Sequence, residues 1–122
     1  MVHAQRIFVL SGLLLGTPAL GQNATQGGAI FAQRCQMCHG NTASATSGVG
    51  PNLYGVVNRK AGATAFAYSS ALKGSNLVWD QATLDRFLSG PSKLVPGTKM
   101  PVSISDPAER TSVVTYLSTL RK

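Results

Sequence analysis

Cys35-Gln36-Met37-Cys38-His39 is the stretch that decides the fold, because it places two thiols and an imidazole within five residues. Cys35 and Cys38 are the only cysteines of the 122-residue chain. Residues three apart lie on the same face of a helix. This segment can therefore present both thiols to one flat partner and project His39 over it.

The C-x-x-C-H spacing indicates covalent attachment of a c-type haem. The thiols of Cys35 and Cys38 would add to the two vinyl groups on one porphyrin edge, and His39 would be an axial ligand of the iron. A thioredoxin-like dithiol is an alternative, but it requires a βαβ pattern that the sequence lacks and does not require the histidine. A structural zinc site needs four ligands, and the chain offers too few near the cysteines.

Length and composition agree with a small domain built around a cofactor. A chain of 122 residues is one domain, which excludes a multidomain enzyme. Aromatic residues are only 7% of the chain, while 13 glycines and 6 prolines indicate much loop. A core this small is marginal by itself, so something besides side chains is expected to fill it.

The N-terminus has the pattern of a secretory signal. Residues 1–21 contain the basic Arg6, an apolar run over 7–15 and small residues at 19–21. The apolar run is too short to span a bilayer, although an uncleaved anchor is the alternative. We therefore predict a cleaved signal peptide over 1–21 and a domain over 22–122. The domain is expected in the periplasm and is not expected to be an integral membrane protein.

The second axial ligand follows by elimination. The other histidine, His3, lies in the predicted signal peptide, and Met37 lies inside the attachment segment. Met100 remains, in Val95-Pro-Gly-Thr-Lys-Met-Pro101, where two prolines and a glycine predict a stiff, non-helical loop. We predict Met100 as the axial ligand opposite His39; the alternative is an ordinary core methionine.

Periodicity and capping signals predict an all-α fold. Helices are expected over 24–38, 69–73 and 81–89, and residues 40–66 are expected to be loop. Asp80 is the predicted N-cap of the third helix. A last helix is expected to have Asp106 as N-cap, Pro107 in its first position and Glu109 completing a capping box.

Together these motifs resemble class I cytochromes c, of the mitochondrial and bacterial c2/c550 kind, over residues 27–120. The resemblance includes Gly50-Pro-Asn-Leu-Tyr-Gly55, Arg59-Lys-Ala-Gly62, Phe66-Ala-Tyr-Ser69 and Trp79. It implies four to five helices and loops wrapped around one covalently bound haem c per chain.

The resemblance also implies roles for residues around the haem. The carbonyl of Pro51 would accept a hydrogen bond from the His39 ring. Tyr68 and Trp79 would hydrogen-bond a haem propionate, and Arg59 would help to neutralise it. The alternative is that Tyr68 and Trp79 are plain core aromatics and Arg59 a surface charge.

Two further roles concern the rest of the haem surroundings. Thr98 would steady the methionine side of the haem, and Gly27 and Phe31 would pack against Tyr116 and Leu117. Phe87 departs from the family, since many relatives have tyrosine there, so the reduction potential is expected to differ from the usual value.

These features predict a one-electron carrier rather than an enzyme. Eleven Lys and Arg against four Asp and Glu give a formal charge of +7, which favours redox partners with acidic docking patches. A dehydrogenase, a bc1 complex or a terminal oxidase would fit; nucleic acid is not expected, and the carrier is expected to be monomeric. If Met100 does not bind the iron, a ligand-binding or peroxidatic role is the alternative.

Overall fold

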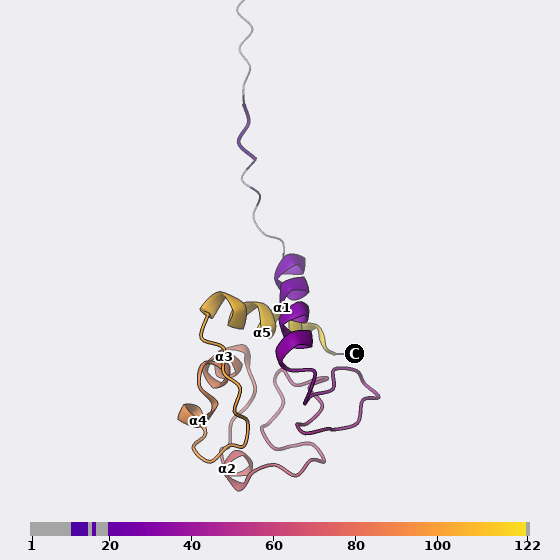
Figure 1. Ribbon diagram of the computed structural model, residues 1–122, viewed down its shortest axis with the longest axis vertical. Helices are drawn as coiled ribbons and strands as arrows, with labels where there is room; N and C mark the ends of the chain where they lie inside the picture. Colours follow the sequence, from indigo (N-terminus) through magenta and orange to yellow (C-terminus); the bar gives the residue numbers. More distant parts are fainter. Residues whose placement is uncertain (1–10, 15, 17–19, 122) are drawn as a thin grey trace, which may run out of the picture.

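The computed structural model describes residues 11–14, 16 and 20–121, and five helices lie among them (Figure 1). These helices are α1 (Leu20–Arg34), α2 (Ser70–Lys73), α3 (Gln81–Ser89), α4 (Pro91–Leu94) and α5 (Pro107–Thr119). The described residues form no strand, only an isolated antiparallel bridge between Lys60 and Val78. The prediction of an all-α fold with four to five helices is confirmed.

Most of the predicted signal peptide, residues 1–21, lies outside the described residues, which include only 11–14, 16, 20 and 21 of it. In the part of the chain that the structure describes, none of the helices has the length and apolar character needed to cross a bilayer.

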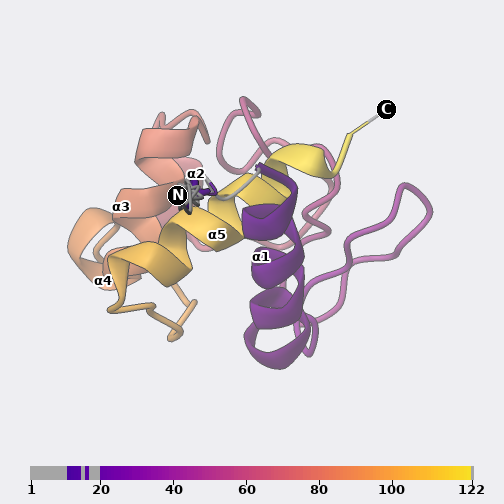
Figure 2. The ribbon, with the colours of Figure 1, turned by 90° about the horizontal axis from the view of Figure 1, so that it is seen from above.

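The first and last helices cross in direct contact and form the top of the molecule in Figure 1 (also Figure 2). A Cβ on Gly27 would lie 1.9 Å from the Ser112 carbonyl oxygen, so the helices meet where α1 has no side chain. Next to this crossing, the rings of Phe31 and Tyr116 lie 5.3 Å apart. The predicted packing of Gly27 and Phe31 against α5 is present.

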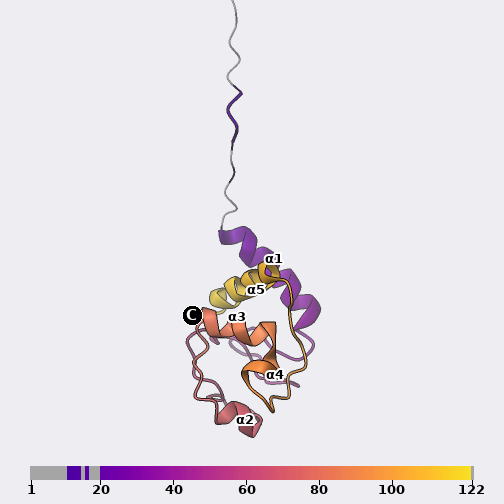
Figure 3. The same ribbon diagram turned by 90° about the vertical axis from the view of Figure 1, so that its left-hand side faces the viewer.

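The core lies beneath this crossing and draws on both helices and on the loops. Phe31, Ile104 and Val113 are its most deeply buried large side chains. Figure 3 shows α3 alongside α5, with α2 at the opposite end of the molecule. The long segment over 39–69 runs along one side in Figure 1, and α3, α4 and the loop over 95–106 run along the other.

The first helix differs from the prediction at both ends. It begins at Leu20 rather than 24 and ends at Arg34 rather than 38. It ends there because the Gln36 amide bonds to the carbonyl of Phe31, five residues earlier, whereas an α-helical amide bonds to the carbonyl four residues earlier. The Cys38 and His39 amides then both donate to the Cys35 carbonyl, at 3.0 Å each. The attachment motif is therefore a tight turn after the helix, not its last turn.

The capping signals of the later helices are largely confirmed. Asp80 accepts the Thr83 amide at 2.7 Å, and Asp106 accepts the Ala108 amide at 2.9 Å. The capping box is only half formed, because the Glu109 carboxylate contacts Arg34 at 3.2 Å instead of folding back. The short helix α4 was not predicted: Pro91 ends α3 and also starts a new turn, since its fixed φ suits a first helical position.

Candidate haem site

The turn over 35–39 places its two thiols at different depths. Cys35 is 8% exposed and belongs to the core, while Cys38 is half-buried, and both are free. Burial raises the pKa of the Cys35 thiol, so this group is protonated at neutral pH. Met37, between them, is 90% exposed. The turn thus directs both cysteines toward the protein and the intervening methionine toward solvent.

The His39 ring is held from two sides. Its Nδ1 lies 2.7 Å from the Pro51 carbonyl oxygen, so Nδ1–H donates and Nε2 keeps its lone pair. This is the hydrogen bond that the resemblance implied. On the other side the ring packs on Gly50, where a Cβ would lie 2.4 Å from Cε1. Burial lowers the pKa of His39, which leaves a neutral imidazole suited to binding a metal.

The loop that carries Pro51 is braced by two polar side chains. The Asn52 amide donates to the carbonyls of Thr42 and Ala45, at 2.9 and 3.0 Å. The Arg59 guanidinium donates to the carbonyls of Tyr54 and Asn52, at 3.1 and 3.0 Å. The acceptor of His39 therefore sits on a loop tied to the rest of the fold on both sides.

Arg59, Tyr68 and Trp79, which are spread over twenty positions of the sequence, are brought to one region. The Trp79 amide donates to the Arg59 carbonyl at 2.9 Å, and Tyr68 lies close enough to Arg59 to raise the pKa of the guanidinium, against the larger effect of burial. Trp79 is 7% exposed, and its ring lies 4.9 Å from that of Phe87. Tyr68 also shares a hydrogen bond with Thr64.

The charge of Arg59 lacks a counterion among the described residues, whose two ion pairs involve other arginines. Burial lowers the pKa of this guanidinium, which means that its positive charge is partly desolvated. A half-buried cation of this kind fits an anionic group such as a propionate. The Trp79 ring N–H likewise has no acceptor among the described residues, which leaves it available as a donor to the same group.

The methionine segment is shaped by a tight turn. The Thr98 amide donates to the Val95 carbonyl at 3.0 Å, and Gly97 takes φ +93°, a conformation that favours glycine. Thr98 and Met100 are both half-buried, and Met100 packs against the core cluster that includes Cys35 and Trp79. The thioether is thus directed inward rather than into solvent.

These groups fit a c-type haem by their chemistry: two thiols in one turn, a neutral imidazole, an inward thioether and an uncompensated guanidinium. Two residues that help to hold them were not singled out from the sequence. These residues, Gly50 and Asn52, lie within the Gly50–Gly55 motif. The glycine directly before Pro51 is the sequence feature that could have pointed to a close contact there.

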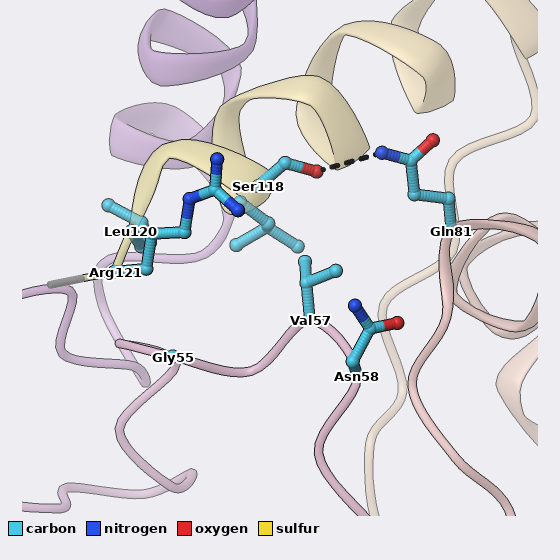
Figure 4. A pocket seen from close by; sticks show the side chains of 8 residues that line it. Gly55, Val57, Asn58, Gln81, Ser118, Leu120 and Arg121 are labelled. Carbon is cyan, nitrogen blue, oxygen red and sulfur yellow. Dashed lines mark hydrogen bonds between the residues drawn. The ribbon is translucent and has the colours of Figure 1, made fainter.

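Two surface hollows lie away from these residues. One, of 210 Å³, is lined by the end of α5 and the turn over 55–58; Figure 4 shows the Gln81 amide bonded to the Ser118 hydroxyl at its rim. The other, of 330 Å³, lies between α1 and α5, beside Ile30 and Ala108. None of the predicted haem residues lines either hollow.

The fold and this set of side chains define a small helical domain that carries a covalently bound haem. The family model for cytochrome c matches residues 24–121, and the chain belongs to this family. It binds haem c covalently and is a monohaem electron carrier, not an enzyme.

Named relatives and a solved structure are similar over most of the chain. Cytochrome c2 of Rhodomicrobium vannielii is 40% identical, over 98% of this chain and 91% of the relative. Cytochrome c2 of Rhodoblastus acidophilus is 47% identical, over 84% of this chain and 92% of the relative. The structure of cytochrome cH from Methylobacterium extorquens matches with a TM-score of 0.73 and 46% identity, over 79% of this chain and 97% of that one.

Proposed function

We propose that this chain is an exported electron carrier whose haem is tethered by Cys35 and Cys38 and whose iron is bound by His39 and Met100. The observation that carries the proposal is the His39 ring. Its Nδ1 is held by Pro51 at 2.7 Å, which leaves Nε2 as the metal-binding nitrogen. The turn that holds this ring also holds both thiols.

When bound, the haem supplies an iron that cycles between Fe(III) and Fe(II). The chain's own residues would orient the haem, shield it from water and keep its surroundings rigid. Arg59, Tyr68 and Trp79 would hold and neutralise a propionate, and Thr98 would steady the methionine side. Because Pro51 and Met100 lie on tied or stiff loops, little of the protein needs to move when the electron arrives.

The distribution of charge supports partners with acidic docking patches. All four acidic residues belong to α3, α5 or their N-caps, and two of them, Asp85 and Glu109, pair with arginines. The segments 35–79 and 91–101 carry basic residues and no acidic one. These are the segments that hold the haem residues, so their basic side chains would attract an acidic dehydrogenase, bc1 complex or oxidase to the site.

We place the carrier in the periplasm, as a monomer over residues 22–122 after cleavage of 1–21. Leu13 and Leu14 are 84% and 99% exposed, so these apolar side chains of the predicted signal do not pack on the domain. Cleavage after Gly21 would shorten α1 by its first two residues. The named bacterial relatives are cytochromes c2, which supports the same assignment.

Visible spectra of the oxidised holoprotein test the axial ligands. The unaltered protein is expected to show the weak far-red band of an Fe(III)–methionine sulfur bond. Met100→Ala should lose this band and bind carbon monoxide readily after reduction. Met37→Ala is the matched control, since its side chain is 90% exposed, and it should keep the band.

A c-type haem spectrum without the band in the unaltered protein would overturn ligation by Met100 and point to an open site with a ligand-binding or peroxidatic role. Separately, the mass of the purified periplasmic protein should equal residues 22–122 plus one haem. A mass that includes residues 1–21 would contradict the cleavage.

A further inference from the structure

Arg110 of α5 makes three polar contacts that join three parts of the chain. Its Nε lies 2.9 Å from an Asp85 carboxylate oxygen on α3. One terminal nitrogen donates to the carbonyls of Ile104 and Ser105, at 3.0 and 2.9 Å. The Arg110 side chain is only 13% exposed, whereas that of its partner Asp85 is 42% exposed.

The two carbonyls belong to the segment over 101–106, which we call the return arm because it leads from Met100 to α5. The arm is fixed at its middle: Ile104 is 0% exposed, and its amide donates to the Leu88 carbonyl at 2.8 Å. Arg34 of α1 adds a bond to the Ser103 carbonyl at 3.0 Å.

This anchoring limits where Met100 can go. Only three residue steps separate Met100 from Ser103, each spanning at most about 3.5 Å, and one of the residues between is Pro101. On the other side, Val95 is 3% exposed and accepts the Thr98 amide. Met100 therefore lies between two fixed positions of the chain, Val95 and Ser103, and loosening either one would let its side chain move farther.

We propose that Arg110, oriented by Asp85, is a positioning residue for Met100: it fixes the return arm and thereby keeps the thioether on the iron. The inference rests on the proposed ligation by Met100. An arginine is suited to this position because its planar fork satisfies a carboxylate and two carbonyls at once, whereas the single ammonium of lysine could not reach all three.

The test is the competition between Met100 and added imidazole for the ferric iron of the holoprotein, followed by loss of the far-red band. Arg110→Gln is expected to raise the apparent affinity for imidazole at least about tenfold, since each hydrogen bond to a charged group is worth roughly this factor. Asp85→Asn keeps the shape and removes the charge, so we expect about a threefold rise. Amide exchange at Ile104 should quicken in the same order.

Gln81→Ala is the matched control, because the Gln81–Ser118 hydrogen bond also joins α3 to α5, at 3.2 Å, but touches no part of the return arm (Figure 4). It should leave the affinity for imidazole unchanged.

The inference is overturned if Arg110→Gln binds imidazole like the unaltered protein, or if Gln81→Ala shifts the affinity as far. If Arg110→Gln yields no holoprotein, Asp85→Asn decides alone, and an unchanged affinity overturns the inference. Absence of the far-red band in the unaltered protein would instead remove the proposed ligation, and this inference with it.

Discussion

Single atoms decide the geometry of His39. The imidazole is fitted between the Pro51 carbonyl and the bare Cα of Gly50. Neither neighbour offers a side chain to the ring: one contributes a backbone oxygen and the other contributes space. The tautomer of the ring and its tilt are therefore set by backbone, which responds little to changes in side chains elsewhere.

Gly50→Ala is accordingly expected to destabilise the holoprotein by about 1–3 kcal/mol, because the added methyl would lie 2.4 Å from Cε1 and the ring must move away from Pro51. Denaturant unfolding measures the loss, and the oxidised spectrum reports the altered ligand field. Gly48→Ala, whose Cβ would lie 3.3 Å from the Cys38 carbonyl oxygen, is the control and should cost less. Equal losses in the two variants would contradict the packing of the ring on Gly50.

At the scale of elements, the contact between α1 and α5 holds the chain together. The crossing joins residues more than 80 positions apart. Cys35 directly follows the last residue of α1, so the crossing also fixes the start of the attachment motif. Gly27 allows the backbones to touch, while a Cβ on the next residue, Gly28, would lie 3.3 Å from the edge of the Tyr116 ring. Two adjacent glycines of one helix thus have different constraints.

We expect Gly27→Ala to lower the free energy of unfolding by about 3 kcal/mol, because its Cβ would overlap the Ser112 carbonyl and the helices must separate. Gly28→Ala should stay within about 1 kcal/mol of the unaltered protein, since the gain in helix propensity offsets a tight contact. Thermal and denaturant unfolding of both holoproteins compare them. A larger loss in Gly28→Ala would show that the two glycines have the opposite roles.

Acidic and basic residues are unevenly distributed over the whole molecule. Acidic groups lie on α3 and α5 or their N-caps, whereas the segments 35–79 and 91–101, which hold the haem residues, carry basic groups and no acidic one. The field of such a molecule orients it as it approaches an acidic partner, which raises the rate of productive encounters.

The rate of electron transfer to an acidic redox protein should therefore fall steeply as ionic strength rises, since the Debye length shrinks from about 10 Å at 0.1 M to about 3 Å at 1 M. Stopped-flow mixing over this range measures it, and a small uncharged reductant is the control, with a nearly flat profile. A flat profile with the protein partner would remove the role of charge in docking.

Much of this protein could be predicted where the signal is local. The thiol spacing of Cys35 and Cys38, the caps Asp80 and Asp106 and the Gly50-Pro51 pair each act through neighbours a few residues away, so the sequence displays them directly. Capping and turn chemistry depend on such short-range bonds. The all-α class and the residue ranges of α2 and α3 follow from the same signals.

Only the tertiary structure decided the features that depend on distant partners. Glu109 leaves its capping box because Arg34, 75 residues away, offers it a charge. The Trp79 amide bonds to the Arg59 carbonyl beside the isolated bridge between Lys60 and Val78, and no local pattern indicates this pairing. The same holds for the contacts of Arg110 with Asp85 and the return arm. By itself the sequence determined which chemical groups are present and which short segments present them. Their arrangement around one site was decided by packing and by desolvated charges, because these energies exist only once remote segments have come together.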